Sequence, residues 1–394
     1  MSIQNLIIAF GGVSPEHEVS VITAIQAAMA LDKNKYNLTP LYVSKSGRFL
    51  TGAHLLDLES YKNLSKLEQE STPCTFSFNA YGAPVLLETK PTGFFSKPKE
   101  HAIDAVLVAF HGSDGENGHF QGLCEQYNIP YTGSGAAASA VGMDKYMAKQ
   151  FARSLNIPVA NDVFILETEW ISNKKEILSS IAKLGKTVFI KPVHLGSSIG
   201  VTKAETEREI EEAVETGFRY DDQLIAEKAI SPLIEVNCSV LGDYNEAKAS
   251  VCEQPVGKEE ALTFEDKYMG DSGKGMASAS RIIPAPISQA LTQQIQATSV
   301  KLFRLLNAGG VARFDFLVNP KEETFYFNEI NTIPGSFSFY LWDKSDMPFG
   351  TLLESMIGLA HKKHRIKNGR VRSFETNLLS EKAVKGIKGL KGKG

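Results

Sequence analysis

The sequence predicts a protein of mixed α/β class with more than one domain, and three observations carry this prediction. The chain has 394 residues, too many for one ordinary hydrophobic core, so two or three packed domains are expected. Short apolar runs that end in glycine and lead into helical segments are typical of parallel strands joined by helices. Strict alternation of apolar and polar residues at 311–318, followed by a turn, predicts an antiparallel hairpin.

The composition is that of an ordinary soluble globular protein. Apolar residues make up 43% of the chain, charged residues 22%, and the net charge is −3, which gives no reason to expect nucleic acid or a membrane as a partner. No apolar run is long enough to span a membrane, and the start, MSIQNLIIAFGG, lacks the basic segment of a signal peptide. The four cysteines fit no CxxC spacing and are interpreted as free thiols of a cytoplasmic protein.

The first predicted domain, 1–135, is of βαβ type. A strand at 5–10 leads into two glycines, Ser14 is expected to be an N-cap with Pro15 in the first turn, and a helix follows from about Glu16. The remaining elements expected here are strands at 36–43 and 105–110, a helix at 118–127 and a glycine-rich turn, TGSGA.

The second predicted domain, 136–230, is smaller, and the third, 231–362, consists mainly of strands. For the second domain we expect a helix at 136–154, a strand at 188–191, a charged helix at 205–215 and a strand at 224–227. For the third we expect a helix at 288–306 and a lid loop at about 263–283, because its segment 271–280 is too polar for a core and too long for a turn. The Lys/Gly-rich residues 363–394 are expected to form a mostly disordered basic tail.

The hairpin at 311–331 carries the clearest chemistry. In VARFDFLV the side chains of Arg313 and Asp315 face one way, and in the returning strand TFYFNEIN the side chains of Glu329 and Asn331 share a face opposite Asp315. Two carboxylates and an amide beside an arginine suit a hard cation such as Mg²⁺. The alternative is a surface salt bridge of Arg313 with one of the carboxylates, which is common in proteins.

Two further segments indicate a nucleotide site less specifically. IKPVHLGSSIGV places a strand lysine before a Gly/Ser loop, where an ammonium group and backbone N–H groups can meet phosphate oxygens, although an ordinary turn would look the same. It is not a P-loop, since GxxxxGK[ST] is absent. In IAEKAI…IEVN, Glu227 and Glu235 could accept hydrogen bonds from an amine or a ribose, or could be solvated glutamates.

Seven motifs together resemble one family. FGGVSPEHEVS, FHGSDGENGHFQG, YTGSGAAASAVGMDK, FIKPVHLGSSIGV, DKYM, ARFDF and EINTIPG occur in the order found in D-alanine–D-alanine ligases, from about residue 5 to residue 360. The resemblance implies a three-domain ATP-grasp fold in which ATP is held between the central and C-terminal domains. It also implies a reaction in which ATP phosphorylates the carboxylate of one D-alanine and the amine of a second attacks the acylphosphate.

The resemblance implies a role for each matching residue on the nucleotide side. Lys145 and Lys191 match the lysines that clamp the phosphates, Glu227 matches the acid beside the adenine, and Glu235 matches the ribose contact. The backbone that lines the adenine is matched by Lys228, Ala229 and Ile230. The ligands of Mg²⁺ or Mn²⁺, with two ions expected, are matched by Asp315, Glu329 and Asn331.

On the substrate side, Arg313 and the backbone at Gly335 match the groups that stabilise the tetrahedral intermediate. Glu16 matches the carboxylate that pairs with the ammonium of the first D-alanine, and Ser197 and Tyr268 match its two hydrogen-bonded partners in a latch for the lid. His111 matches a histidine near the first substrate. Taken singly, these could be a turn serine, a half-buried aromatic ring and a structural imidazole.

The sequence departs from the family at the expected acceptor pocket. Where the family places a serine that holds the carboxylate of the second substrate, this chain has Tyr340, with Ser336 and Leu341 nearby in NTIPGSFSFYLW. A phenol can donate one hydrogen bond but is much bulkier than a serine hydroxyl. The identity of the second amino acid is therefore open.

The resemblance implies an ATP-dependent carboxylate–amine ligase that forms D-alanyl-D-alanine for peptidoglycan, with ATP and D-alanine as its partners and a homodimer as a possible assembly. The alternatives are an ATP-grasp ligase with a different acceptor, such as another amino acid or a D-hydroxy acid, and a catalytically silent nucleotide-binding relative. The matching lysines, arginine and carboxylates argue against a silent protein.

Overall fold

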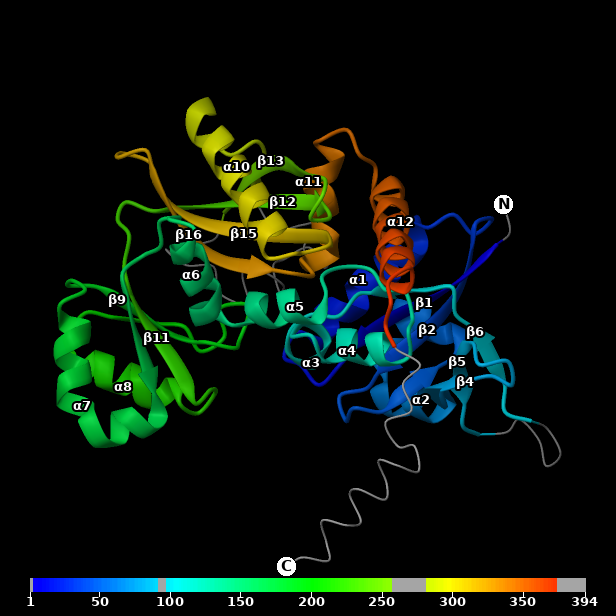
Figure 1. Ribbon diagram of the computed structural model, residues 1–394. Helices are drawn as coiled ribbons and strands as arrows, with labels where there is room; N and C mark the ends of the chain where they lie inside the picture. The colour runs from blue at the N-terminus through cyan, green and yellow to red at the C-terminus, as the bar shows by residue number, and fades with distance from the viewer. Residues whose placement is uncertain (1–2, 91–96, 257–280, 374–394) are drawn as a thin grey trace, which may run out of the picture.

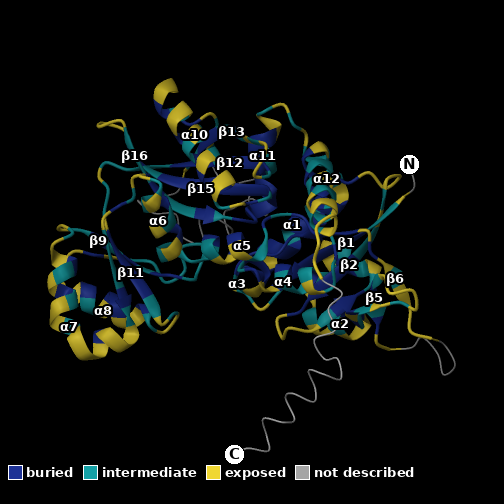
Figure 2. Ribbon diagram, viewed as in Figure 1, coloured by how far each residue is buried: buried dark blue, intermediate teal, exposed yellow. Residues whose placement is uncertain are grey.

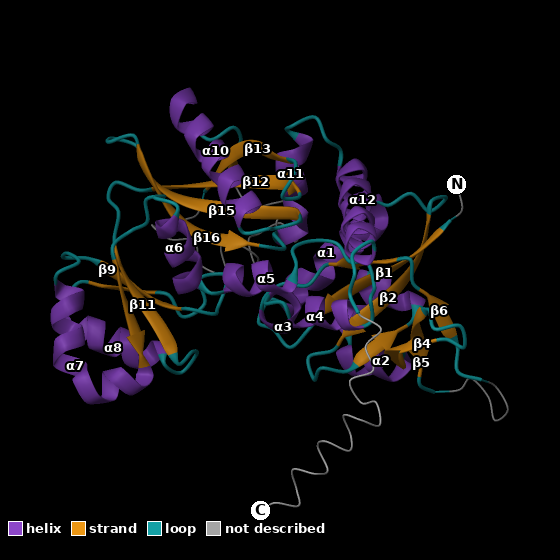
Figure 3. Cartoon of the chain, in the orientation of Figure 1, coloured by secondary structure: helices purple, strands orange, loops and turns teal. Residues whose placement is uncertain are grey.

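The computed structural model describes residues 3–90, 97–256 and 281–373, and within these ranges the strands form three sheets, each flanked by helices (Figures 1 and 3). Tyr268, most of the predicted lid and the end of the predicted tail lie outside the described residues. In the ranges that are described, no helix has both the length and the apolar character needed to cross a membrane.

The first sheet has seven strands in the order β6-β5-β4-β3-β2-β1-β7. Its strands are β1 (Gln4–Gly11), β2 (Tyr36–Val43), β3 (Phe49–Thr51), β4 (Thr72–Phe78), β5 (Pro84–Glu88), β6 (Glu100–Ala102) and β7 (Ala105–Val108). Strand β1 pairs in parallel with both β2 and β7 and is buried on both faces, so the predicted βαβ arrangement is confirmed there. The accompanying helices are α1 (His17–Ala30), α2 (Leu64–Glu70), α3 (Ser113–Glu116) and α4 (His119–Gln126), with 3₁₀ turns η1 (Ala53–Leu56) and η2 (Leu58–Lys62).

The predicted N-cap of α1 was wrong. The helix begins at His17 with Glu16 in the cap position, and no side chain caps it. The Ser14 hydroxyl instead accepts a hydrogen bond from the Glu16 backbone at 3.0 Å and donates one to the His111 carbonyl at 2.8 Å. Ser14 therefore joins the loop after β1 to the loop after β7, a long-range contact that local cap rules do not include.

The second sheet has four strands in the order β10-β9-β11-β8. Its elements are β8 (Asp162–Leu166), α7 (Glu167–Ala182), β9 (Val188–Pro192), β10 (Thr202–Ala204), α8 (Glu207–Gly217) and β11 (Gln223–Lys228). Before it lie α5 (Ala136–Met143) and α6 (Lys145–Ser154), where a single helix had been predicted. Asp144 is extended and its side chain accepts a hydrogen bond from the Met147 backbone, so it ends the first helix and caps the second.

The third sheet is antiparallel, in the order β14-β13-β12-β15-β16. Its strands are β12 (Ile234–Gly242), β13 (Ala247–Pro255), β14 (Arg281–Ile282), β15 (Gly310–Asn319) and β16 (Thr324–Asn331), with helix α10 (Gln289–Leu305) packed against it. The predicted hairpin is confirmed, and Asp315 lies opposite Glu329. A bulge follows, because Phe316 pairs with Phe327 and leaves Asn328 without a partner in β15.

The C-terminal elements return to the first sheet. They are the 3₁₀ turn η4 (Gly335–Ser338), α11 (Phe339–Asp343) and α12 (Phe349–Asn368). Leu352, Met356 and Ile357 of α12 are buried in the same apolar core as Leu6 of β1, and the helix packs against α1 and β7 (Figure 1). Figure 2 shows that α7 and α8, at the opposite end of the molecule, expose their outer faces.

The predicted start of the tail at residue 363 needs correction, because α12 continues to Asn368. Its last turns carry basic side chains that contact the first domain. The Lys363 ammonium donates to the Tyr131 hydroxyl at 3.0 Å, His364 bonds to the Asn128 carbonyl at 2.8 Å, and Lys367 forms an ion pair with Glu125. Charge composition alone did not reveal these partners.

Candidate active site

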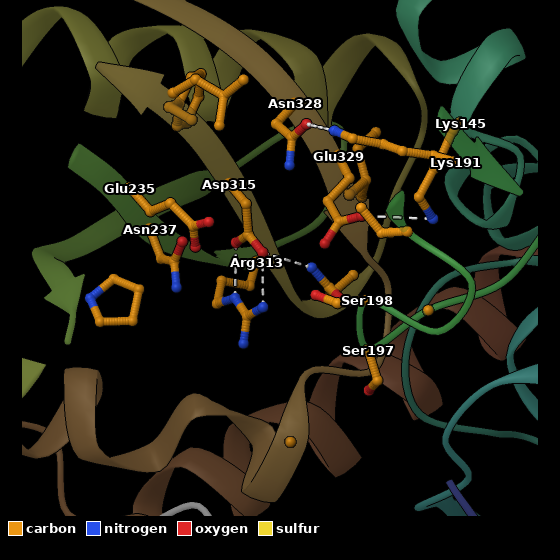
Figure 4. A pocket seen from close by; sticks show the side chains of 18 of the residues that line it. Lys145, Lys191, Ser197, Ser198, Glu235, Asn237, Arg313, Asp315, Asn328 and Glu329 are labelled. Atoms are coloured by element: carbon orange, nitrogen blue, oxygen red, sulfur yellow. Dashed lines mark hydrogen bonds and ion pairs between the residues drawn. The ribbon is translucent and has the colours of Figure 1, made fainter. Parts of the chain in front are cut away.

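One pocket gathers residues from the segments that follow β1 and β7 and from the second and third sheets, and sixteen of the predicted site residues line it. Figure 4 shows part of it, with the hairpin side chains facing the loop that carries Ser197 and Ser198. The predicted residues in its lining are Glu16, His111, Lys145, Lys191, Ser197, Glu227, Lys228, Ala229, Ile230, Glu235, Arg313, Asp315, Glu329, Asn331, Gly335 and Tyr340. Ser336 and Leu341 are buried beneath the surface and are not part of the lining.

The hairpin β15–β16 places its polar face toward this pocket. Arg313 holds Asp315 in a bidentate contact, with Nε at 2.7 Å from Oδ1 and Nη2 at 2.6 Å from Oδ2, and the Asn331 amide donates to Oδ2 at 3.0 Å (Figure 4). The salt bridge weighed as an alternative to a metal site is therefore present, but it is buried. The carboxylates of Asp315 and Glu329 and the Asn331 amide lie together on the hairpin, and this polar cluster offers the oxygen ligands that a hard divalent cation prefers.

Two lysines reach this cluster from the second sheet and its preceding helix. Lys145, the first residue of α6, lies with its ammonium 3.5 Å from the Glu329 carboxylate and donates to the Leu195 carbonyl. Lys191 of β9 contacts Glu227 at 2.7 Å and the Asn328 amide oxygen at 3.3 Å. Burial favours the neutral amine, but attraction to Glu227 outweighs it and raises the pKa of Lys191, so its ammonium stays charged.

The Gly/Ser loop lies between these lysines and the first domain. Ser197 and Ser198 both have positive φ, at 54° and 58°, which tightens the chain into a turn. Gly196 approaches Glu16 closely, since an added Cβ would lie 3.0 Å from its Oε2. The Ser197 hydroxyl donates to the other oxygen of Glu16, so the loop after β9 is tied to the start of α1.

Two buried titratable groups lie beside Glu16. Burial lowers the pKa of His111 to about 4, so its imidazole is neutral, and its Nε2 lies 2.8 Å from the Thr23 hydroxyl. Burial, together with repulsion from Glu16, raises the pKa of Glu116 to about 7. Glu116 accepts backbone hydrogen bonds from Gly112 at 2.9 Å and Ile333 at 3.0 Å, and so links the segment after β7 to the segment after β16.

Apart from Ser198, which lies in the predicted Gly/Ser loop, the sequence interpretation missed five polar residues of the lining, which are Glu116, Asn237, Glu253, Arg281 and Asn328. Glu116 could have been noticed as an acid between glycines shortly after a buried strand, in HGSDGENG. Asn328 reaches the pocket only through the bulge in β16, and alternation along the strand would have turned it away. The other three carry no local signal.

At the far end of the pocket, Tyr340 stands beside Arg281 and Glu253. Its hydroxyl donates to Glu253 Oε1 at 2.9 Å, and the Arg281 guanidinium lies over its ring, 3.7 Å from the centroid. Arg281 also contacts Glu253 Oε2 at 3.0 Å, and the Asn237 amide donates to Oε1 at 3.2 Å. Burial and the nearby Glu253 carboxylate raise the pKa of Tyr340 to about 12, so the phenol remains a donor.

His194, in the Gly/Ser loop, belongs to a compact group with Asp221 and Asp222 that has the spacing of metal ligands. Its ring nitrogens lie 3.5 Å from Asp144 and 3.1 Å from Asp221. Hydrogen bonds to these carboxylates, Asp144 first, raise the pKa of His194 to about 10. In this structure the imidazole pairs with Asp144, the N-cap of α6, and with Asp221, so it acts as an ion-paired brace between the Gly/Ser loop and α6.

Comparison with known proteins identifies relatives of nearly full length. Residues 5–134 match the family profile described as the D-ala D-ala ligase N-terminus, and residues 151–358 match the profile of its C-terminus. The D-alanine–D-alanine ligase of Thermosipho africanus is 38% identical over 385 residues, covering 97% of this chain and 100% of that protein. The D-alanine–D-alanine ligase of Thermosipho melanesiensis is 37% identical over 381 residues, covering 97% and 99%.

Solved structures agree with the sequence matches. The D-alanine–D-alanine ligase from Coxiella burnetii is 29% identical, with a TM-score of 0.76, covering 94% of this chain and 97% of that one. The VanG D-Ala:D-Ser ligase from Enterococcus faecalis is 27% identical, also with a TM-score of 0.76, covering 91% and 100%. These relatives have the ATP-grasp fold that the sequence motifs implied.

Proposed function

The chain belongs to the D-alanine–D-alanine ligase family, and we propose that it is an ATP-dependent ligase that joins two D-alanines into D-alanyl-D-alanine for peptidoglycan synthesis. The observation that carries the proposal is the convergence, in one pocket, of two lysines, an arginine and the oxygen cluster of the β15–β16 hairpin. A reaction that makes an acylphosphate needs such an arrangement, because negative charge must be neutralised while two substrates are held in line.

For the nucleotide we propose that Lys145 and Lys191 bind the phosphates. Glu227 is proposed to accept from the adenine amino group, with the backbone of Lys228, Ala229 and Ile230 beside the ring and Glu235 at the ribose. Support comes from their common place in the pocket lining, together with the apolar walls of Phe189, Met143 and Leu317 that a flat base requires. The backbone N–H groups of the Gly/Ser loop are proposed to donate to phosphate oxygens.

We propose that Asp315, Glu329 and Asn331 hold two Mg²⁺ or Mn²⁺ ions, because their oxygens have the hard donor character that these ions prefer. The ions, when bound, would supply charge neutralisation at the transferring phosphoryl group. Arg313 is anchored to Asp315 by two hydrogen bonds, so its guanidinium is held in a fixed direction. With the backbone N–H at Gly335, it is proposed to stabilise the tetrahedral intermediate.

For the first D-alanine we propose that Glu16 pairs with the ammonium group. The hydrogen bond from Ser197 to Glu16 supports this role, since it fixes the carboxylate and ties the first domain to the loop. Tyr268, the third member of the proposed latch, lies outside the described residues. His111 is neutral and buried, which suits a hydrogen-bonding role better than that of a strong base.

For the second substrate we propose that Tyr340 forms the wall of a small acceptor pocket. Its hydroxyl is engaged by Glu253 and its ring by Arg281, so the phenol is held inward rather than turned away. Ser336 and Leu341 are buried behind it and would act through their backbone or through packing. A rigid aromatic wall admits D-alanine and excludes bulky side chains.

We further propose that the enzyme acts in the cytoplasm, which agrees with its four free, buried cysteines, and that it can form a homodimer. A test of the main proposal supplies purified chain with ATP, Mg²⁺ and D-alanine as the donor, either alone or with one further acceptor at a time: D-serine, larger D-amino acids, L-amino acids or D-lactate. Phosphate release and product mass are measured. D-Alanine should give the fastest turnover, with one ADP formed per dipeptide.

Other outcomes of this assay separate the alternatives. Faster turnover with D-serine or D-lactate would keep the ligase chemistry and replace the acceptor. Nucleotide binding without ADP formation for any acceptor would identify a catalytically silent relative and contradict the proposal.

A further inference from the structure

Lys149 is a fully buried lysine that the reaction outlined above does not use. It lies on α6, its side chain is 0% exposed, and it is not part of the pocket lining. Its ammonium is 3.0 Å from Glu227 Oε1, off the direction of a good hydrogen bond, so the contact is mainly Coulombic. A lysine is almost never buried without a charged partner, and this one has a partner at the nucleotide end of the pocket.

Glu227 is shared by two lysines. Its Oε1 faces Lys149 in the interior, while its Oε2 faces Lys191 at 2.7 Å on the pocket side. Burial favours the neutral acid, but the two ammonium groups, Lys149 first, outweigh burial and lower the pKa of Glu227 to about 2. The neighbouring charges on β8 and α6, Asp162 and Arg153, pair with each other. One buried carboxylate therefore faces two lysines, and although burial lowers the pKa of Lys149, attraction to Glu227 opposes that shift.

The two lysines differ in what they can reach. Lys191 lines the pocket and also contacts Asn328 beside the proposed metal site, whereas Lys149 is enclosed and no ligand can reach it. When a phosphate draws Lys191 away, Glu227 loses one cation. If Lys191 were its sole counter-ion, Glu227 would become a buried carboxylate without a cation, which is strongly unfavourable. The movement of Lys191 from Glu227 to a phosphate would then be opposed.

We propose that Lys149 is a positioning residue, the fixed counter-ion of Glu227 that releases Lys191 to bind the phosphates of the nucleotide. The inference rests on the proposed nucleotide site and adds a residue behind it. Lys149 keeps Glu227 ionised and oriented both with and without bound nucleotide. The carboxylate can then accept a hydrogen bond from the adenine while Lys191 binds the phosphates.

The counter-ion role is tested without nucleotide, by a double-mutant cycle on thermal unfolding. Lys149→Met leaves Glu227 with one cation, and Glu227→Gln removes the carboxylate that Lys149 pairs with. Each substitution should therefore lower Tm. The double variant removes both charges and should recover most of the loss. Lys175→Met, an exposed lysine of α7, is the control and should leave Tm unchanged. Additive losses in the double variant would overturn the counter-ion role.

The release of Lys191 is tested by calorimetric titration with ATP and Mg²⁺. We expect Lys149→Met to weaken binding at least about tenfold, because Lys191 is then the only cation available to Glu227. Lys149→Arg, which keeps the charge, should stay within about threefold of the native Kd and guards against a folding defect in the Met variant. The double variant should bind like Glu227→Gln alone.

The pH dependence separates this role from simple packing. In Lys149→Met the pKa of Glu227 rises, so lowering the pH protonates the carboxylate and frees Lys191. The ratio of the variant Kd to the native Kd should therefore shrink between about pH 8 and about pH 5.5. A constant ratio, or native affinity in the Met variant, would overturn the release role. Absence of ATP binding by the native chain would refute the proposed function itself, and the unfolding cycle would still decide the counter-ion role.

Discussion

The two ends of the pocket are built in different ways. At the nucleotide end, Lys191, Glu227 and Glu329 project from strands of five, six and eight residues, and Lys145 projects from a helix that Asp144 caps. At the acceptor end, Arg281 lies on a strand of two residues, and Ser336, Phe337 and Ser338 all have positive φ. Regular strands fix the nucleotide groups through their register, while the acceptor groups depend on contacts among side chains that are far apart in sequence.

This difference predicts how each end responds to change. A substitution at the nucleotide end should remove a charge whose position the strands fix. It should therefore reduce the turnover rate with every acceptor. Substitution at the acceptor end should change the choice of acceptor and leave ATP handling intact, because Tyr340, Arg281 and Glu253 hold one another.

The largest effect is expected for Glu329→Gln. It keeps the shape of the side chain but removes a charge from the oxygen cluster, so kcat should fall about a hundredfold or more with every acceptor. The measurement is steady-state turnover together with Tm, which should stay close to native. Glu322→Gln, on the exposed turn of the same hairpin, is the control. Near-native turnover by Glu329→Gln would contradict the metal assignment.

Next is Tyr340→Ser, which should open the acceptor pocket. Activity with D-alanine should stay within about threefold, while larger D-amino acids gain about tenfold in kcat/KM relative to D-alanine. Tyr340→Phe keeps the ring and loses only the hydrogen bond to Glu253, so it should remain selective. Loss of the best acceptor without gain of another would mean that the phenol contacts the substrate directly.

Arg281→Lys should have a smaller effect at the same end. Lysine keeps the charge but cannot stack as a plane on the Tyr340 ring or hold Glu253 with a rigid fork. We expect KM for the acceptor to rise about fivefold, with KM for ATP within about twofold of native. Arg304→Lys on the exposed face of α10 is the matched control. Equal rises in the KM for the acceptor and the KM for ATP would contradict the distinction between the nucleotide end and the acceptor end of the pocket.

The smallest effect concerns the brace of the Gly/Ser loop. The folded-state pKa of His194 is about 10, above its ordinary value near 6.5, because Asp144 and Asp221 favour the imidazolium. Its stabilisation is therefore complete below about pH 6.5 and is lost as the pH rises toward 10. His194→Asn should lower Tm at about pH 6 and match the native Tm near pH 10. A difference in Tm that does not change with pH would argue against the ion-paired brace.

Sequence reasoning located the hairpin residues because alternation alone decides which way a strand side chain points. It placed Asp315 opposite Glu329 correctly, since only the register of two adjacent strands was needed. It could not place Asn328, which faces the pocket because of a bulge, nor the break at Asp144, which needs a side-chain cap to be recognised.

Residues that act through distant partners were not predictable. Arg281 and Glu253 belong to adjoining strands but are 28 residues apart in sequence, so their contact is not visible in a local pattern. Tyr340 comes from a third element, α11. No local pattern in the predicted helix at 136–154 distinguishes Lys149, which is buried against Glu227. In each case a long-range pairing of charges, rather than any local pattern, determines the role.

The return of α12 to the first sheet affects how the chain can fold during synthesis. Leu352, Met356 and Ile357 complete a core whose other members, such as Leu6, leave the ribosome more than three hundred residues earlier. Part of the apolar surface of the N-terminal segment therefore stays exposed until translation is almost finished. A nascent chain stopped before residue 349 would bind chaperones and be cut by proteases, whereas one released after residue 368 would not.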